Sequence, residues 1–434
     1  MSTTQIIYGS LSASTISGGT FYGNGSGLSG VGGPTIYSAG TGTTSTYRVG
    51  ANNVVLGNYS LVGGGCFNTS SCDFSFVGGG FCNTASQDGS IVAGGNGNTA
   101  SGYRSTVSGG YYSTASNYYS TVGGGRFHTS NGDNSTIAGG ATNRAIGNNT
   151  TVGGGFNNKA LNNKTTIGGG YSNTSFGNGS TIGGGEYNTS ISGCTTFIGG
   201  GNYNTALGEH STVVGGIFNK NLTNYTFIGG GSGNTSSDYG LYSTIVGGFG
   251  NTASCYYSTI GGGYCNLSSG YASSVGGGYR NSATWYESTV SGGYNNTASC
   301  NYSFIGGGSD NKVVGEFGVV VAGKQNTSGI FGFIGLGSCN TILATGNSRT
   351  FIGNGFNNTI SGVYDSGILT GLNNIITHNC SFIIGSGICS TAANTTHMNC
   401  LNLKDIPVDP APATLPLGTI YRCSTDSNRL YICI

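Results

Sequence analysis

Few side chains in this sequence are of types that catalyse reactions or bind metals. The four histidines lie far apart, without the spacing of a metal site: His128, His210, His378 and His397. Nine acidic residues between positions 70 and 320 form no neighbouring pair of the kind that glycoside hydrolysis requires: Asp73, Asp88, Asp133, Glu186, Glu209, Asp238, Glu287, Asp310 and Glu316. The many Gly-Gly-Gly runs lack the lysine of a phosphate-binding loop. We therefore expect no catalytic residue, no metal and no cofactor, and a protein that is not an enzyme.

The 13 cysteines are spread thinly and contain no Cys-x-x-Cys motif, which argues against zinc and thioredoxin-like sites. Several share one position of the repeat described below, for example Cys72, Cys255 and Cys300. Such replacement of a small residue favours free thiols. Lateral disulfides, formed within or between chains after release from a reducing cell, are the alternative.

Composition excludes several classes of function. The 434 residues include 87 Gly, and only 6% are charged, with a net charge of +1. This balance provides no basic surface for nucleic acid or an anionic membrane. No run of about 18 apolar residues predicts a membrane span. The N-terminus, Met-Ser-Thr-Thr-Gln-Ile-Ile-Tyr, lacks the basic and apolar regions of a Sec signal peptide, so we expect export by another route.

A repeat of about 15 residues organises the chain. Its centre is Ser-Thr-Val-Gly-Gly-Gly, as at residues 120–125, and we call the Val or Ile position n. The 22 copies of position n are Val62, Val77, Val92, Val107, Val122, Ile137, Val152, Ile167, Ile182, Ile198, Val213, Ile228, Ile245, Ile260, Val275, Val290, Ile305, Val320, Ile334, Ile352, Ile368 and Ile383. The first eight steps are 15 residues each, and a fixed period of this kind is typical of a solenoid.

Fifteen residues are too few for two helices but suffice for one flattened coil of parallel β-structure. Positions n−2, n, n+2, n+6 and n+8 share parity, so we expect them to point inward along two short strands. Stacked coils would then pile the Val and Ile side chains into a narrow core. At about 4.8 Å per coil, 22 coils predict an all-β parallel solenoid roughly 105 Å long.

Two other kinds of position in the repeat hold nearly the same residue type in successive coils, and we call each such series of equivalent residues a column. The Val and Ile residues at position n are called the anchors. Position n+3 is Gly in every copy except the last, and n+2 is usually Gly, which indicates either positive φ or close backbone approach. Position n+6 is nearly always Asn. We interpret this column as structural, either tolerating left-handed backbone or forming a ladder of stacked amides. Tyrosine recurs at n−3, where we favour edge packing over sugar binding.

The chain divides into three parts. Residues 1–46 precede the repeats and are predicted to cap the first coil or attach the chain, although Tyr47–Asn53 reads as a degenerate coil. Residues 47–398 are the β-roll domain, which is regular to about 310 and wider and less regular beyond. Residues 399–434 contain a Pro-rich linker and then two apolar segments around Ser-Thr-Asp-Ser-Asn, which predict a β-hairpin. Aligning Cys423 with Arg429 places Cys433 opposite Thr419.

The coil Tyr119-Ser-Thr-Val-Gly-Gly-Gly, together with the Asn-Thr-Ala-Ser segments at 83–86 and 98–101, resembles the head repeats of YadA-like (Hep/Hag type) trimeric adhesins. The resemblance covers about residues 47–395. It implies a left-handed β-roll that assembles as a homotrimeric fibre. Similar repeats occur in fibre proteins of phages and giant DNA viruses, which need neither an export signal nor a membrane anchor.

We therefore hypothesise a fibre on a virus particle that acts as a spacer and attaches to a host or surface. Its expected partners are two further copies of itself, a particle or filament that anchors one end, and a cell-surface glycan or protein receptor. A second hypothesis is a ligand-binding solenoid, such as a glycan-binding protein or an ice-binding protein with Ser and Thr columns at n−2 and n−1. A polysaccharide-degrading spike is the least favoured.

Overall fold

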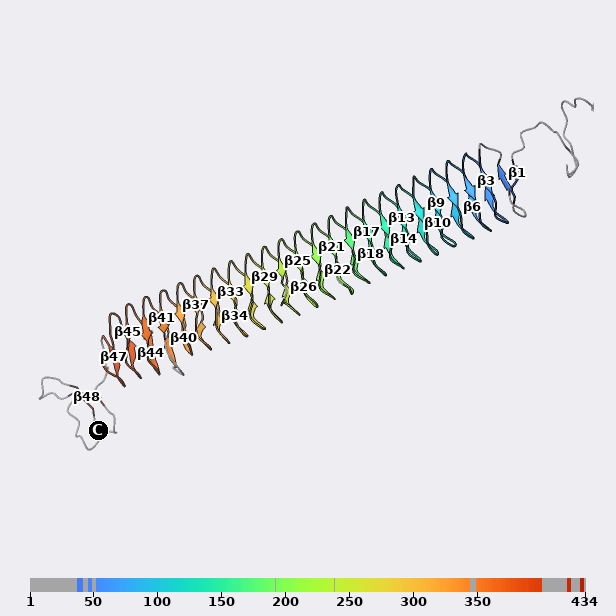
Figure 1. Cartoon of the computed structure of the whole chain (residues 1–434). Helices are drawn as coiled ribbons and strands as arrows, with labels where there is room; N and C mark the ends of the chain where they lie inside the picture. The colour runs from blue at the N-terminus through green and yellow to red at the C-terminus, as the bar shows by residue number, and fades with distance from the viewer. Residues whose placement is uncertain are drawn as a thin grey trace, which may run out of the picture.

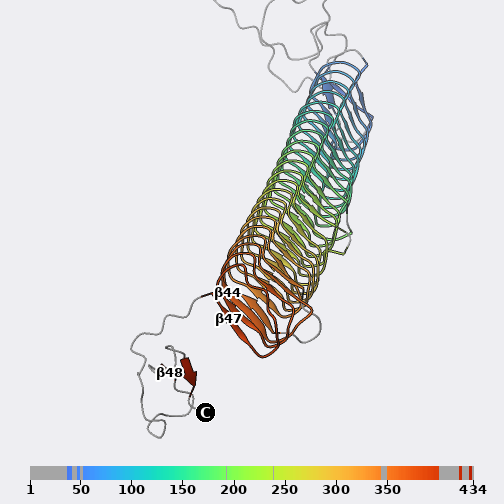
Figure 2. The same cartoon turned by 90° about the vertical axis from the view of Figure 1, so that its left-hand side faces the viewer.

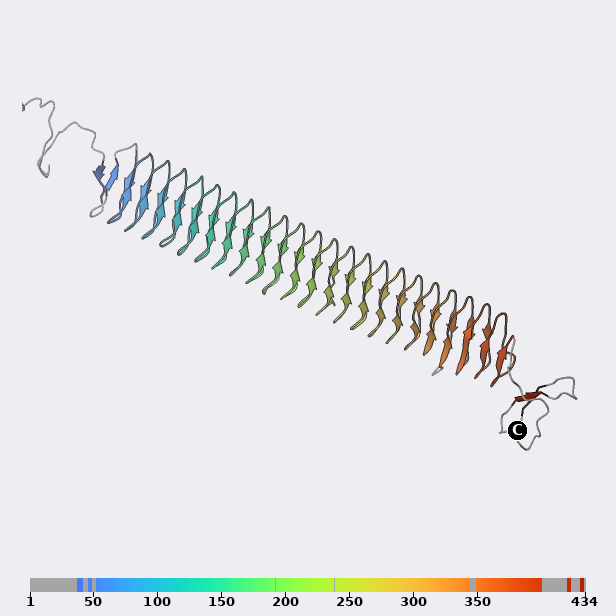
Figure 3. The same ribbon diagram turned by 180° about the vertical axis from the view of Figure 1, so that it is seen from behind.

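The protein is a straight rod of stacked coils, shown along its length in Figures 1 and 3. The computed structural model describes residues 37–41, 46–48, 52–191, 193–237, 239–343, 349–399, 420–422 and 430–432. All regular structure in these residues is β-strand. None of them belongs to a helix long and apolar enough to span a bilayer. The all-β parallel solenoid predicted from the 15-residue period is thus confirmed.

Each coil contributes one short strand to each of two sheets, which we call sheet A and sheet B. In sheet A the strands cover n−1 and n, from β4 (Leu61–Val62) to β38 (Val319–Val320). In sheet B they cover n+7 and n+8, from β5 (Thr69–Ser70) to β39 (Thr327–Ser328). The preceding coil contributes β2 (Thr46–Arg48) to sheet A and β3 (Val54–Val55) to sheet B. Figure 2, turned by 90°, shows the flattened coils stacked along one axis.

Equivalent residues of successive coils pair in parallel and in register. Val107 lies between Val92 and Val122 in sheet A, and Ala115 lies between Ala100 and Ser130 in sheet B. A third line of parallel bridges joins the n+4 residues, beginning with Cys66 and Phe81. Backbone hydrogen bonds therefore run along the rod axis, from each coil to the next, so that no coil satisfies its backbone alone.

The interior of each coil holds four side chains. All 22 residues at position n are fully buried, including every anchor from Val62 to Ile228. Position n+8 is a small residue such as Ala100, and n−2 is a hydroxyl residue such as Ser120, whose Oγ donates to the carbonyl of Asn117 at 2.7 Å. The fourth is the n+6 residue. Half of the core is therefore polar. Its asparagines are hydrogen-bonded, as burial favours, whereas the hydroxyls of Ser175, Ser211 and Thr350 have no hydrogen-bond partner.

The n+6 asparagines form a ladder of amides, which is one of the two structural interpretations predicted from the sequence. Asn219 Oδ1 accepts the backbone N–H of Asn234 at 3.0 Å, and its Nδ2 donates to the carbonyls of Gly215 (2.9 Å) and Gly231 (3.0 Å). The other interpretation is wrong, because left-handed backbone occurs at n+5 and n−3 instead of n+6. Asn53 forms the first rung, since its Oδ1 accepts the N–H of Asn68, and Tyr47 pairs with Val62.

The expectation that n+2 points inward is also wrong. Gly139, an n+2 residue, has no atom within 4 Å of where a Cβ would stand. The position that requires glycine is n+3. Gly140 has φ +92°, and a Cβ there would lie 2.1 Å from the carbonyl oxygen of Gly155 in the next coil. The turn after each sheet A strand interrupts the alternation of side chains at n+2, and inward positions resume at n+6 and n+8.

The last coils have longer strands and a more apolar core. The strands of these coils are β40 (Gly332–Ile334), β41 (Thr341–Leu343), β42 (Thr350–Ile352), β43 (Thr359–Ser361), β44 (Ser366–Thr370), β45 (Ile375–Ile376), β46 (Phe382–Ile384) and β47 (Thr396–Met398). In four of the last coils n+8 is Val or Ile, and Val313, Ile342, Ile360 and Ile376 are fully buried, whereas Ser328 holds this position in the coil of Val320. The extra residues of the long steps fall between a sheet B strand and the next sheet A strand, as between β21 (Thr189–Ser190) and β22 (Phe197–Ile198).

Antiparallel pairs occur near both ends of the chain. β1 (Tyr37–Ala39) pairs with β2 (Thr46–Arg48), and β2 pairs in parallel with β4 of the rod. β48 (Ile420–Arg422) pairs with β49 (Leu430–Ile432), with Tyr421 opposite Tyr431. The two apolar segments from which the sequence predicts a hairpin are therefore paired antiparallel. Residues 1–36 and the Pro-rich linker lie outside the described residues.

Candidate functional site

The described side chains contain no group of three or more His, Cys, Asp or Glu that could hold a metal ion. His128 occupies the asparagine column and is 1% exposed. Its Nδ1 accepts the backbone N–H of Asn143 at 3.2 Å, as an asparagine oxygen does elsewhere. Burial lowers the pKa of this imidazole, although nearby backbone groups of Gly140 and Asn143 oppose the shift. His128 is thus a neutral structural substitute for asparagine.

The expectation that no two carboxylates share a position in neighbouring coils is wrong for Asp73 and Asp88. Asp73 is 11 residues after Val62, and Asp88 is 11 residues after Val77, so the two occupy equivalent places in adjacent coils. The same turn carries Cys72, and burial, followed by the charges of Asp88 and Asp73, raises the pKa of its thiol. Asp88 is exposed, and Asp73 Oδ1 accepts the backbone N–H of Asn58. A carboxylate pair on an exposed turn without a cleft does not form a hydrolytic site.

Glu186 and Glu209 occupy different positions of their coils, as the sequence indicates. Asp238 and the cysteines at 400, 423 and 433 lie outside the residues whose side chains the structure describes. No disulfide joins any two of the ten cysteines in the described part of the chain.

Aromatic side chains form ladders along the two edges of the coils. Along n−3, Tyr225, Tyr242 and Tyr257 stack with ring centroids 5.1 and 5.2 Å apart and planes within 14° of parallel. Along n+5, Tyr187 and Tyr203 stack in the same way at 4.7 Å. Because stacked rings cover one another's faces, they cannot present those faces to a sugar. The edge-packing interpretation of the n−3 tyrosines fits this geometry.

The n+4 column contains a ladder of four rings: Phe249, Tyr264, Tyr279 and Tyr294. Their centroids are 5.0, 4.9 and 5.2 Å apart, and neighbouring planes lie within 8° of parallel. The next n+4 residue is Ser309, which is too small to cover the far face of Tyr294. Tyr294 is accordingly 50% exposed, whereas the inner ring Tyr264 is 40% exposed. The ladder therefore ends in an aromatic ring with one uncovered face.

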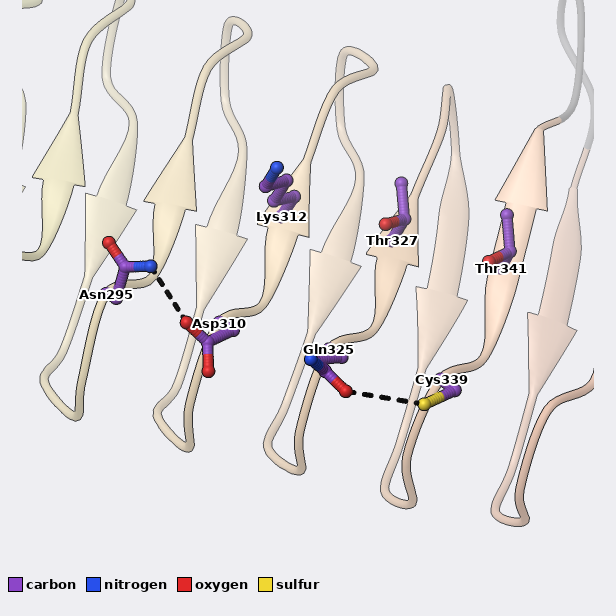
Figure 4. Close-up of a pocket in the computed structure, with 7 residues that line it drawn as sticks. All are labelled: Asn295, Asp310, Lys312, Gln325, Thr327, Cys339 and Thr341. Atoms are coloured by element: carbon purple, nitrogen blue, oxygen red, sulfur yellow. Dashed lines mark hydrogen bonds between the residues drawn. The ribbon is translucent and has the colours of Figure 1, made fainter.

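A shallow polar groove starts at Asn295, the residue that follows Tyr294 in the chain (Figure 4). One side is formed by n+5 residues and the other by n+7 residues on the outer surface of sheet B. The n+5 side consists of Asn295, Asp310, Gln325 and Cys339, and the n+7 side consists of Lys312, Thr327 and Thr341. Amide, carboxylate, hydroxyl and ammonium groups thus line a groove that extends along the rod over four coils. Such a row of donors and acceptors suits a polar, elongated ligand.

Hydrogen bonds fix the acidic group of the groove. Asp310 Oδ2 accepts the hydroxyl of Ser309 at 2.6 Å, and Oδ1 accepts the Asn295 Nδ2 at 2.8 Å. These two bonds, assisted by the charges of Lys324 and Lys312, hold the pKa of the Asp310 carboxyl below its ordinary value. The only ion pair in the described residues is Arg349 with Asp365, so neither lysine ammonium is paired.

The sequence interpretation missed this groove and a second outward column. Threonine at n+7 and serine at n+9 point outward from sheet B in four successive coils, at Thr69/Ser71, Thr84/Ser86, Thr99/Ser101 and Thr114/Ser116. The hydroxyls at n−2, by contrast, are buried, so the n−2 column proposed for an ice-binding surface is wrong. The n+7 repetition is visible in the sequence, but its outward direction depends on the turn that precedes it.

Comparison with known proteins does not assign a family: neither the scan against protein-family models nor the search of curated proteins found a match.

Proposed function

We propose that this protein is a structural fibre in which three copies assemble side by side as left-handed β-rolls, on the surface of a virus particle. In this role the rod holds an attachment surface away from the particle. The resemblance of the repeats to YadA-like adhesin heads supports the trimer and the handedness. The observation that supports the fibre role is the repetitive interior, in which the same position n of successive coils is buried along a straight axis.

A stripe of exposed apolar side chains supports assembly with further copies. It lies on the outer surface of sheet A in the last coils and includes Phe304, Val321, Phe333, Leu369 and Phe382, each 37–53% exposed. Because apolar surface of this extent is unfavourable in water, contact with the same stripe of another copy would stabilise the fibre. The low net charge of +1 adds little repulsion between identical chains.

The assembly is tested by native mass spectrometry of the full chain together with negative-stain electron microscopy. A mass of three chains and rods of uniform width are expected, whereas monomeric particles would exclude the trimer. The double variant Phe333→Ser and Leu369→Ser should release monomers. Leu343→Ser, which removes a 49% exposed side chain from the opposite sheet, is the matched control and should leave the trimer intact. Antibodies against the chain should label intact virus particles if the fibre is on their surface.

An ice-binding solenoid is the second candidate, and the paired Thr and Ser columns on sheet B favour it. Hydroxyls there recur once per coil, at about 4.8 Å. The array is interrupted where Arg144, Lys159 and Lys220 occupy n+7. Thermal hysteresis measured at high protein concentration decides this candidate, because a protein that does not bind ice produces none.

A further inference from the structure

We propose that the groove between Tyr294 and Phe356 binds an acidic oligosaccharide, with the uncovered face of Tyr294 against a sugar ring and the ammonium groups of Lys312 and Lys324 against a carboxylate. The inference deepens the attachment role proposed above and rests on it for its biological meaning. It depends on three features of the structure: the end of an aromatic ladder, a gap in that ladder, and two unpaired lysines.

The end of the ladder supplies the platform. A pyranose ring has a face of C–H bonds, and these pack against the negative face of an aromatic ring. Inside the ladder each face is occupied by the next ring, at 4.9 Å between Tyr264 and Tyr279. At Tyr294 the neighbour on the far side is Ser309, and the ring is 50% exposed. A sugar could therefore occupy the position that the next aromatic ring would fill.

The gap in the ladder sets the length of the ligand. After Tyr294 the n+4 residues are Ser309, Lys324 and Ser338, and the next aromatic ring is Phe356. Four coil steps separate the two rings, a distance of about 19 Å at 4.8 Å per step. This distance fits a short oligosaccharide lying along the rod. Phe356 is also 50% exposed and closes the far end of the gap.

The charges of the groove favour an anionic sugar. The described rod contains five lysines, and Lys312 and Lys324 are on adjacent coils, Lys312 lining the groove and Lys324 immediately before the lining residue Gln325. Both side chains are exposed, and neither is in an ion pair. Asp310 is already satisfied by Ser309 and Asn295, so it orders the groove while the two ammonium groups remain available to a ligand carboxylate. Gln325, Thr327 and Thr341 offer hydrogen bonds to sugar hydroxyls.

The experiment uses the full chain, with tetragalacturonate as the carboxylated probe and galactotetraose as the neutral one. Isothermal titration calorimetry and saturation-transfer NMR should detect the carboxylated probe, with affinity that falls as salt increases. Tyr294→Ala should weaken binding about tenfold, in line with the energy of aromatic contacts. Tyr294→Phe, which keeps the ring, should retain it. The double variant Lys312→Gln and Lys324→Gln should abolish the salt dependence and the preference for the acidic probe.

Two matched variants control for indirect effects. Tyr264→Ala removes an inner ring of the same ladder, and Lys220→Gln removes another n+7 lysine; both should bind as the unchanged protein does. Failure of tetragalacturonate to bind, equal binding of the neutral probe, or binding that survives Tyr294→Ala would overturn the proposal. Native mass spectrometry of the same sample separates the two proposals. A trimer that does not bind rejects only the glycan site, and a monomer rejects the fibre assembly.

Discussion

The side-chain Oδ1 of Asn83 accepts the backbone N–H of Asn98, 3.0 Å away in the next coil. The same bond recurs along the rod, for example from Asn296 to Asn281 and from Asn326 to Asn311. Most of these asparagines also donate to two glycine carbonyls, one in their own coil and one in the next, as Asn281 does to Gly277 and Gly293. One buried side chain thus satisfies three backbone groups of the glycine turn, which explains its recurrence at n+6.

We predict that Asn219→Leu destabilises the coils around residue 219 by about 3 kcal/mol or more, because three buried backbone groups lose their partners at about 1–3 kcal/mol each. Asn219→Ser should cost less, since Ser113 already stands in this column and its Oγ accepts the N–H of His128 at 3.3 Å. Hydrogen exchange measured coil by coil locates the loss of protection. Equal protection in the two variants would show that the amide ladder does not stabilise the rod.

The two glycines at 139 and 140 should respond differently to the same substitution. Gly140→Ala places a Cβ against the Gly155 carbonyl oxygen at φ +92°, and we expect it to cost about 1–3 kcal/mol. Gly139→Ala enters open space and should change the free energy of unfolding by less than about 0.5 kcal/mol. Urea unfolding of the two variants checks the difference. Similar losses at both positions would contradict the assignment of n+3 as the demanding turn residue.

The inward and outward residues of one sheet A strand should also differ. Ile182 in β20 (Thr181–Ile182) is fully buried, so Ile182→Ala should destabilise the protein by about 2–5 kcal/mol. Thr181 points outward, and Thr181→Ala should have an effect below about 0.5 kcal/mol. Thermal unfolding followed by circular dichroism measures both. A small effect of Ile182→Ala would mean that the anchors are not the main apolar support of the rod.

His128 should make stability depend on pH. Because burial lowers its pKa in the folded state, the unfolded chain binds the proton more readily. Stability is then fully present above the ordinary histidine pKa of about 6.5 and is lost as pH falls below that value towards the folded pKa. His128→Asn restores the amide of the column, so the variant should be less sensitive to acid in this range. Denaturant midpoints of both proteins, compared at several pH values, measure the difference; parallel curves would rule out His128 as the cause.

Much of the fold could be predicted from spacing. The spacing of Val and Ile identifies the buried residues of sheet A, and the spacing of Asn identifies the amide ladder. The two apolar segments around Ser-Thr-Asp-Ser-Asn indicate the pairing in which Tyr421 lies opposite Tyr431. These features depend on which residues occupy equivalent positions, and equal spacing along the chain determines that directly.

The tertiary structure decided which columns face inward and which lie side by side. Parity along the chain predicts an inward Gly139, but the turn after position n breaks the alternation, and a Cβ on that glycine would point into open space. The same turn brings the n+5 and n+7 columns together, so that Asn295, Asp310 and Lys312 border one groove although they belong to two coils. The sequence alone determines the period and the residues in each column, because both are properties of spacing. The direction of each side chain follows from backbone angles at the turns, which only the folded coil defines.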